Sequence, residues 1–239
     1  MLVSVITVCY NPQIDGLKKT ILSVVDGFLS SRNIEMEYII IDGGSTNGAI
    51  DLINKVILEN NDIKIKLIVE ADDGIYDAMN KGIYHSNGDW LIFMNSGDSF
   101  SDKKTLVSCV ENFDEKKAII YGDMISNSRI VKAHPLSYLE KGIMMACHQS
   151  MFFNRKLIGS ELKYNLEFPI YADYELVVRI LTKIPGSMLY NGLVVANYEG
   201  GGVSDTISLQ KRKDKYRIVY MYYGMAGVLK SIFHRIFSR

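Results

Sequence analysis

The N-terminal half of the chain alternates short apolar runs with longer stretches in which apolar residues recur every three or four positions. The short runs are rich in β-branched residues and are bounded by Gly, Asn or Asp, which is typical of strands buried in a parallel sheet. They predict strands at residues 3–8, 38–41, 65–69, 90–94 and 118–121, and the longer stretches predict helices at 14–30, 47–60, 75–86 and 102–113. This alternation favours an α/β fold in which a mostly parallel central sheet is flanked by helices.

The C-terminal half is less regular. Its pattern predicts a mixed region over residues 121–170, a helix at 172–183, a strand pair at 187–198 and helices from residue 206 to the end. No repeat or low-complexity linker divides the 239 residues. We therefore predict one domain over residues 1–209, followed by a helical tail at 210–239.

The tail is basic and amphipathic. Residues 210–239 hold eight Lys and Arg against one Asp, whereas residues 1–209 hold 19 basic and 26 acidic residues. Apolar side chains recur on one face of the predicted helix, at Met225, Val228, Leu229, Ile232, Phe233, Ile236 and Phe237. A basic amphipathic helix is typical of contact with an anionic membrane surface. Packing on the domain, or in a homodimer, is the alternative that the pattern allows.

Composition narrows the classes of function. The formal net charge is zero, so bulk electrostatics gives no reason to expect a nucleic-acid partner. Cys9, Cys109 and Cys147 are too widely spaced for a disulfide framework or a zinc cluster, which favours a reducing cytoplasm. The first residues do not match a signal peptide, and no run of 18 uncharged apolar residues predicts a transmembrane helix.

Polar residues follow each of the first four predicted strands. These strands end at residues 7–11, 42–48, 70–74 and 95–98, and the four segments carry carboxylates, amides or glycines. In open α/β sheets, ligands bind at the carboxyl ends of the strands, so the segments predict one shared binding site. The chain has neither the GxGxxG string of a dinucleotide site nor the GxxxxGK[ST] phosphate loop.

The string DGGSTNG at residues 42–48 carries the most information. Its glycines permit close approach of a ligand to the backbone, and Ser45 or Thr46 can cap the helix that follows. Asp42, at the tip of an apolar strand, is placed to accept hydrogen bonds from a base or a ribose. A turn with a helix cap is the alternative reading of this string taken alone.

Taken in order, these strings resemble the motifs of the family 2 glycosyltransferases of the GT-A fold. The resemblance rests on VSVITVCYN at 3–11, EYIIIDGGSTNG at 37–48, EADDGIYDAMNKG at 70–82, GDWLIFMNSGD at 88–98, HQSMF at 148–152, ADYE at 172–175 and GGVS at 201–204. It implies a donor half at residues 1–100 and an acceptor half at 101–209. It also implies transfer of a sugar from a nucleoside-diphosphate sugar, with a UDP-sugar as the first expectation, to a glycan or polyprenyl-linked oligosaccharide. The pattern is closest to bacterial enzymes that build O-antigen, capsule or exopolysaccharide.

The resemblance also implies roles for single residues. Asp42 is expected at the uracil or ribose, Asp73 at the base, and Lys81 near the diphosphate. Asp98 is expected to reach a divalent metal, Mn²⁺ or Mg²⁺, and Asp173 to act as general base in a single displacement with inversion. The further candidates are Thr7, Tyr10, Gly43, Ser45, Asn80 and Asn95 for the nucleotide, and His148, Gln149, Tyr174 and Glu175 for the acceptor or the sugar.

The sequence departs from the family pattern at two places. Asn47 stands where an acidic residue is usual, and an amide can still cap a helix or bind a ribose. The common Asp-x-Asp metal motif is represented by Asn95 to Asp98, which leaves one carboxylate for the cation. Asn95 would supply at most a neutral oxygen to that cation.

Several alternatives stay open at this point. Asp173 could cap its helix, Lys81 could be a solvated helix lysine, and either Asp72 or Asp73 could face the nucleotide, of which we expect Asp73. An inactive nucleotide-sugar-binding scaffold at the membrane is a second functional class. A sugar nucleotidyltransferase is a third, but it should carry an early Gly-rich loop with Arg or Lys, where this chain has CYNPQ.

Overall fold

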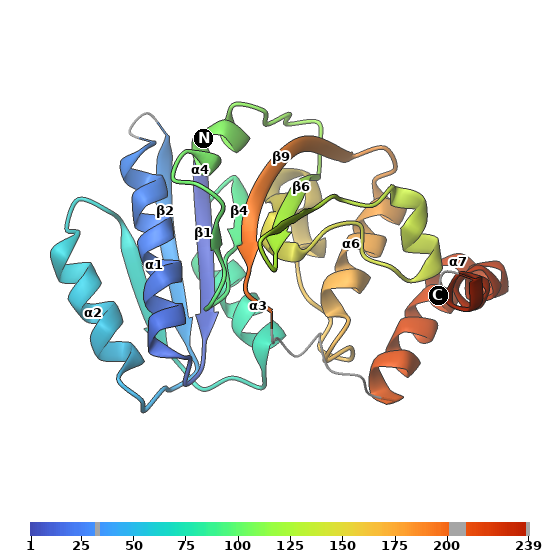
Figure 1. The fold of residues 1–239 in the computed structure, drawn as a ribbon, viewed down its shortest axis with the longest axis horizontal. Helices are drawn as coiled ribbons and strands as arrows, with labels where there is room; N and C mark the ends of the chain where they lie inside the picture. The colour runs from blue at the N-terminus through green and yellow to red at the C-terminus, as the bar shows by residue number, and fades with distance from the viewer. Residues whose placement is uncertain (32–33, 201–208, 238–239) are drawn as a thin grey trace.

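The computed structural model describes residues 1–31, 34–200 and 209–237 of the chain. Within these residues a mixed sheet runs through the molecule in the order β3-β2-β1-β4-β8-β6-β9-β5, with β7 paired to β6 (Figure 1). The expected motif at 201–204 and the last two residues lie outside the described residues.

The N-terminal half is a parallel sheet covered by helices, as the hydrophobic pattern predicts. Its elements are β1 (Leu2–Cys9), α1 (Ile14–Leu29), β2 (Glu35–Asp42), α2 (Ala49–Glu59), β3 (Ile65–Val69), α3 (Ile75–His85) and β4 (Trp90–Phe93). All pairings among β1, β2, β3 and β4 are parallel, so their carboxyl ends lie at one edge of the sheet. The polar segments that follow these strands meet at that edge.

The C-terminal half joins the sheet through antiparallel strands. It contains β5 (Ser99–Phe100), α4 (Thr105–Val110), β6 (Ile119–Ser126), β7 (Arg129–Val131), β8 (Met151–Asn154), α5 (Arg155–Ile158), α6 (Ala172–Lys183), β9 (Met188–Tyr198) and the 3₁₀ turns η1 (Leu136–Lys141), η2 (His148–Ser150) and η3 (Gly159–Glu161). β8 is antiparallel to both β4 and β6, whereas β9 runs parallel to β6. The parallel character therefore belongs to the first half, and the whole sheet is mixed.

The expected strand pair at 187–198 is wrong, because the segment forms the single strand β9. The Asn-Gly pair at 191–192 is the usual signal for a hairpin turn. Here Gly192 has a φ of 73°, and the register against β6 shifts between the Tyr121–Tyr190 and Asp123–Val194 pairs. The pair therefore forms a bulge, after which the strand continues along β6.

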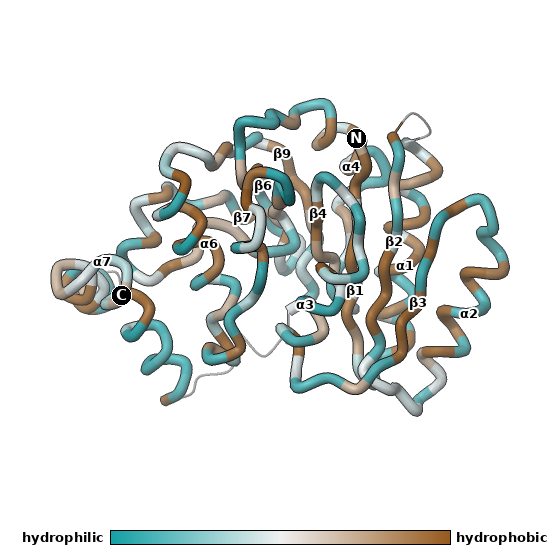
Figure 2. Tube along the Cα trace, turned by 180° about the vertical axis from the view of Figure 1, so that it is seen from behind, coloured by the Kyte–Doolittle hydropathy of each residue, from teal (hydrophilic) through white to brown (hydrophobic). Residues whose placement is uncertain are grey.

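Two hydrophobic cores lie on opposite faces of the sheet. One contains Val3 and Val5 of β1 with the buried face of α1, and the other contains Ile6 and Val8 with α3 and α6. The alternation of β1 side chains between the two cores follows from the two-residue period of a strand. In Figure 2 the central strands are correspondingly hydrophobic along their length, and both faces are covered.

The tail is one long element, α7 (Leu209–Phe237), that is interrupted at Gly224. Gly224 has φ 62° and ψ −162°, which ends one helical limb at 209–223 and starts another at 225–237. The first limb buries Ile218 and Val219, and the second buries Gly227 and Ser231. Within the described residues, no helix has the length and apolar content that crossing a bilayer requires.

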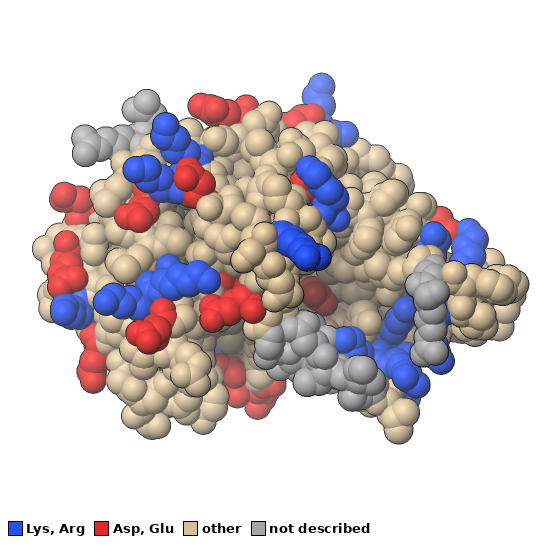
Figure 3. All heavy atoms as spheres, viewed as in Figure 1, with Lys and Arg blue, Asp and Glu red and all other residues tan. Residues whose placement is uncertain are grey.

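The amphipathic stripe of the second limb faces outward. Its small residues are buried, and its large apolar side chains are the exposed ones: Met225, Leu229, Ile232, Phe233, Ile236 and Phe237. In Figure 2, α7 lies at one end of the molecule. In Figure 3, Lys and Arg side chains gather over the first limb, beside a hollow between the two halves.

A buried carboxylate fixes the edge of the sheet opposite the polar segments. Glu37, at 1 % exposure on β2, accepts a hydrogen bond from Ser4 Oγ at 2.6 Å and another from the backbone N–H of Asn87, and pairs with Lys64 at 3.4 Å. Burial by itself raises the pKa of the Glu37 carboxyl, but these donors outweigh it and hold the pKa below its usual value. The contacts tie β1, β2 and the turn before β4 together.

Glu37→Gln is therefore expected to lower the free energy of unfolding at pH 7 by about 1–3 kcal/mol, since a charged acceptor with buried donors is lost. A carboxyl whose pKa is lowered by folding stabilises the protein above its unfolded pKa, and the stabilisation is lost as the pH falls through the folded pKa. Urea unfolding between pH 7 and pH 3 should thus show the two proteins converging at low pH. Glu35→Gln, at an exposed position of the same strand, is the control. A constant difference across the pH range would contradict this account.

Candidate active site

A cavity of about 530 Å³ opens where the first four strands end. Segments from both halves form its wall, and the residues used below are Tyr10, Asp72, Tyr76, Asn95, Asp98, His148, Gln149 and Asp173. A second cavity of about 260 Å³ lies beside it and shares His148, Gln149, Asp173 and Tyr198 with it. Three of the four polar segments predicted to meet, at residues 7–11, 70–74 and 95–98, therefore border one cleft.

The loops that follow β1 and β2 are joined into one unit. Asn11 donates its N–H to Ser45 Oγ at 2.7 Å, and its side-chain oxygen accepts the N–H of Thr46 at 2.9 Å. Asp42 is fully buried, and its Oδ1 accepts the N–H groups of Gly44 and Ser45 at 2.9 and 2.6 Å. Asp42 and Ser45 thus hold the loop in its conformation through hydrogen bonds, and they do not line the cavity.

Thr7 has a similar position. It is fully buried, and its hydroxyl lies 2.7 Å from the carbonyl oxygen of Met94 and 2.8 Å from the hydroxyl of Tyr38. These bonds hold the ends of β1, β2 and β4 together. Thr7, like Asp42, supports the cleft and is not part of its surface.

Tyr10 and Asp72, which line the cavity, converge on Gly43, and we call this part of the wall the slot. Tyr10 is 65 % exposed and lines the cavity. A Cβ atom on Gly43 would lie 2.5 Å from Asp72 Oδ2 and 3.2 Å from Tyr10 Cδ2. Only glycine allows this close approach of an aromatic ring and a carboxylate.

Asp72 lines the cavity, whereas Asp73, the residue expected at the nucleotide base, does not. Asp72 Oδ1 accepts the N–H of Gly74 at 2.9 Å, and this Asx turn directs the side chain to the cavity. Asp73 is exposed, lies outside the cavity wall, and donates its N–H to Asp77. The Asp-x-Gly spacing from 72 to 74 is the signal that could have distinguished them.

Asn80 and Lys81 form hydrogen bonds with neighbouring segments and do not line the cavity. Asn80 bonds both the N–H and the carbonyl of Tyr164, at 2.8 and 3.0 Å. Lys81 Nζ donates to the carbonyl of Ala71 at 2.5 Å and pairs with Glu70 at 3.0 Å. In this structure the Lys81 ammonium thus interacts with the loop between β3 and α3.

Asp98 lies at the bottom of the cleft with both oxygens engaged. At 5 % exposure, its Oδ1 accepts the N–H of Glu199 at 3.0 Å and its Oδ2 accepts Nε2 of Gln149 at 2.5 Å. Burial raises the pKa of the Asp98 carboxyl, although these hydrogen bonds oppose the rise. Among the described residues, Asn95 Oδ1 and Gln149 Oε1 are buried with no hydrogen-bond partner.

These atoms form a set of hard oxygen donors. The described residues contain no cluster of three His, Cys, Asp or Glu that could hold a metal. Mg²⁺ and similar cations are commonly held by one or two carboxylates, with phosphate and neutral oxygens completing the shell. Asp98 with the unpartnered amide oxygens of Asn95 and Gln149 fits that requirement, provided that a phosphate supplies the remaining ligands.

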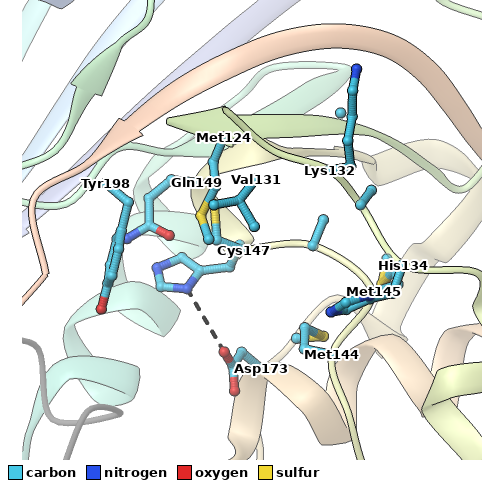
Figure 4. A pocket seen from close by; sticks show the side chains of 14 residues that line it. Met124, Val131, Lys132, His134, Met144, Met145, Cys147, Gln149, Asp173 and Tyr198 are labelled. Atoms are coloured by element: carbon cyan, nitrogen blue, oxygen red, sulfur yellow. Dashed lines mark ion pairs between the residues drawn. The ribbon is translucent and has the colours of Figure 1, made fainter. Parts of the chain in front are cut away.

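Asp173 stands across the cleft from Asp98, in the first turn of α6. Its Oδ1 lies 3.0 Å from the hydroxyl of Tyr76, and its Oδ2 lies 3.8 Å from Nδ1 of His148 (Figure 4). Nε2 of His148 in turn lies 2.8 Å from Nδ2 of Asn95. A polar chain therefore runs from the end of β4 through His148 to the Asp173 carboxylate, and sequence reasoning missed Tyr76 as its fourth member.

The capping alternative for Asp173 holds only in part. The residue that caps α6 is Tyr171, which has no side-chain cap bond, although Asp173 Oδ1 does accept the N–H of Tyr174 at 2.8 Å. That bond occupies one oxygen, and the other faces His148. The carboxylate thus keeps an oxygen at the cleft that both cavities share.

Tyr174 and Glu175 lie away from the cleft. Tyr174 is 1 % exposed and donates its hydroxyl to the carbonyl of Leu139 at 2.5 Å. Glu175 is 2 % exposed, pairs with Arg179 at 3.0 Å and accepts the hydroxyl of Tyr222 at 2.5 Å. Neither lines a cavity of the site, and both join α6 to neighbouring elements, because helix periodicity turns them from the side that carries Asp173.

Known proteins match this chain in sequence and in fold. The profile of the family described as "Glycosyl transferase family 2" matches residues 4–168. A PGL/p-HBAD biosynthesis glycosyltransferase of Mycobacterium bovis is 32 % identical over 178 residues, which is 72 % of this chain and 69 % of that protein.

Solved structures extend the likeness over nearly the whole chain. TarS 1–349 of S. aureus in complex with UDP-GlcNAc superposes with a TM-score of 0.74 at 15 % identity, covering 97 % of this chain and 70 % of that one. Against a longer TarS chain the match covers 92 % of this chain and 39 % of that chain, with a TM-score of 0.68. The mannosyltransferase PcManGT of Pyrobaculum calidifontis, in complex with GDP-Man and Mn²⁺, gives 0.67 at 12 % identity, covering 96 % and 72 %.

At these identities the solved structures establish the fold, which is GT-A, and the sequence match establishes the family. The cleft lies where the strands of the N-terminal half end, and Asp98 and Asp173 both line it. The chain belongs to family 2 of the glycosyltransferases.

Proposed function

We propose that this chain is an inverting glycosyltransferase that moves a sugar from a nucleoside-diphosphate sugar, a UDP-sugar in the first instance, to a glycan or polyprenyl-linked oligosaccharide in bacterial surface polysaccharide synthesis. One observation carries the proposal. Asp98 and Asp173, from different halves of the molecule, border one cleft that also contains the Tyr10–Asp72 slot. The UDP-GlcNAc and GDP-Man complexes of proteins with this fold support a nucleotide-sugar donor.

The donor is expected to extend from the slot to Asp98. The exposed ring of Tyr10 offers an apolar face for the base, and Asp72 can accept hydrogen bonds from base or ribose. The diphosphate then lies toward Asn95, Asp98 and Gln149, which would hold the divalent cation. That cation, Mn²⁺ or Mg²⁺, would neutralise the charge that develops on the departing diphosphate.

Asp173 is the proposed general base. The acceptor hydroxyl must lose a proton as it attacks the anomeric carbon, and a carboxylate within hydrogen-bond reach can take that proton. Nε2 of His148 faces the Asn95 amide, so with that amide nitrogen donating, the ring carries its proton on Nδ1, toward Asp173. Attack from the Asp173 side, opposite the diphosphate, inverts the anomeric configuration in one step.

The rival functional classes make different predictions. An inactive scaffold would bind the nucleotide sugar without turning it over, and a nucleotidyltransferase would require a nucleoside triphosphate. A thermal-shift screen of nucleotide sugars with Mg²⁺ and Mn²⁺, followed by assays of UDP release, separates the three classes, since a ligand stabilises the state that binds it.

We also propose that α7 contacts the inner face of the cell membrane, which would make a cytoplasmic enzyme peripheral. The exposed apolar stripe at residues 225–237 lies beside basic side chains, and such residues near an anionic leaflet contribute about 1 kcal/mol each. A homodimer that buries the same stripe is the alternative. An acceptor linked to polyprenol would remain in that membrane.

Asp173→Asn should lower the turnover number by about 10²- to 10⁴-fold, because a general base contributes that much. The affinity for UDP should stay nearly unchanged, since the substitution removes charge on the acceptor side of the cleft. UDP release and UDP-induced thermal shift measure the two quantities. Glu167→Gln, at an exposed position paired with Arg217, is the control. Lost UDP binding with residual transfer would refute the base assignment.

Asp98→Asn should weaken the metal-dependent part of UDP affinity by at least about tenfold, the equivalent of about 1.4 kcal/mol. Only the ionised carboxylate binds the cation well. Because burial raises the pKa of Asp98, the metal-dependent stabilisation of the wild type should be lost as the pH falls through a value above that of an ordinary Asp. Titrations of UDP with Mg²⁺ or with EDTA, from pH 8 to pH 4, test this. An unchanged response to EDTA in the variant would exclude Asp98 as a ligand.

Replacing Phe233 and Phe237 by Asp should release the chain from vesicles of anionic phospholipid without changing its affinity for UDP. Both side chains are more than 60 % exposed, so the fold should tolerate the change. Leu58→Asp, at an exposed position of α2, is the control, and vesicle sedimentation is the measurement. The stripe is not a membrane contact if the double variant still sediments with the vesicles. The same holds if the wild type forms a dimer and does not sediment with the vesicles.

A further inference from the structure

The second cavity lies on the acceptor side of Asp173. It encloses about 260 Å³ and is separated from the nucleotide cleft by the side chains that both cavities share: His148, Gln149, Asp173 and Tyr198. Figure 4 shows the Asp173 carboxylate at one edge of this cavity, and its dashed line marks the ion pair of Asp173 with His148. A group bound here would thus present its nearest atoms to the proposed base.

The wall facing these polar residues is apolar. It is formed by Met124, Val131, Ala133, Met144 and Met145, which come from β6, β7 and the segments on either side of η1. The N–H of His134 donates to the carbonyl of Met145 at 2.6 Å, which fixes the two segments to each other. Methionine side chains are adaptable and offer almost no hydrogen bonding.

The remaining polar side chains of this cavity are those of Lys132, His134 and Cys147. Lys132 donates to Asp123 at 2.7 Å, and the ring of His134 stacks on Tyr138 with centroids 4.7 Å apart. Cys147 Sγ lies 3.2 Å from Ser150 Oγ. Lys132 and His134 thus keep hydrogen-bonding groups of their own, whereas the side chains of Met124, Met144 and Met145 offer contact only.

A fully hydroxylated hexose does not suit such a cavity. A cavity of about 260 Å³ has room for one substituted ring. A hydroxyl pressed against the methionine wall would lose its hydrogen bonds to water and gain none, which is unfavourable. A methyl group at the same place would instead gain contact with the thioethers.

We propose that this second cavity binds the acceptor ring, and that it selects a ring with an apolar far side, of which a 6-deoxyhexose is the simplest carbohydrate. The inference rests on the proposed function, since it takes Asp173 as the base. The ring's nucleophilic hydroxyl lies at Asp173 and His148, and its methyl group contacts Met124 and Met144. Selection of the acceptor then depends on the methionine wall, and binding of the nucleotide does not.

The test compares sugars that differ only in the hydroxyl group on C6. Methyl glycosides of D-fucose and D-galactose, and of L-rhamnose and L-mannose, are titrated calorimetrically into the full chain with UDP and Mg²⁺ present. In at least one pair the deoxy sugar should bind on the order of tenfold more tightly, because its hexose partner buries an unpaired hydroxyl. Equal affinity in both pairs, tighter binding of the hexoses, or no binding of any of the four overturns the proposal.

Two variants assign the preference to the wall. Met124→Gln and Met144→Gln place an amide of similar length at partly exposed positions, so both proteins should fold. Each should reduce the preference for the deoxy sugar several-fold, whereas Met221→Gln, on the exposed side of α7, should leave it unchanged. A preference that survives both wall substitutions contradicts the assignment.

Measurement of UDP binding distinguishes a failure of the proposed function from a failure of the inference about the second cavity. If UDP with Mg²⁺ fails to stabilise the wild type, the proposed function itself is refuted. If UDP binds normally to the wild type and to the Gln variants but the deoxy sugars show no preference, the nucleotide assignment stands and only the methionine-wall inference falls.

Discussion

Two side-chain hydrogen bonds join the halves of this protein at the point where its chemistry is proposed to occur. Asp98 accepts from Gln149, and Asn95 lies within hydrogen-bond distance of His148, so the end of β4 is fixed to η2. Both contacts are buried or nearly so, where a polar group without a partner is costly. The positions of the proposed metal ligands and of the base therefore depend on each other.

This junction gives a reason for the departure from the Asp-x-Asp pattern. A carboxylate at residue 95 could only accept a hydrogen bond, and a neutral His148 facing it would have to turn its protonated nitrogen toward β4. The amide of Asn95 can donate to Nε2, which leaves the Nδ1 proton toward Asp173. The same amide keeps an unpartnered oxygen, so one residue can serve the cation and the base together.

The second cavity and α7 are linked by aromatic contacts. His134, on the wall of the second cavity, stacks on Tyr138 of η1, and Tyr138 contacts His234 of the second limb edge-on with centroids 5.5 Å apart. The break at Gly224 turns this limb so that Gly227 and Ser231 pack inward and the phenylalanines point out. The proposed membrane contact of α7 and the second cavity, which is proposed to bind the acceptor, would thus lie close to each other.

The sequence by itself determined the parallel half of the fold, the edge of the sheet where polar residues collect, and the family. Strand periodicity and strand-end polarity are local properties, so β1 to β4 and the cleft at their ends could be predicted from particular residues such as Asp98. The tertiary structure alone decided which polar side chains reach the cavity. Asp42, Thr7 and Lys81 turned out to support loops, Asp72 replaced Asp73, and Tyr174 and Glu175 faced the core, because such choices depend on partners far away in the chain. The outward stripe of α7 and the methionine wall beside Asp173 were decided in the same way, by packing between segments that no local pattern relates.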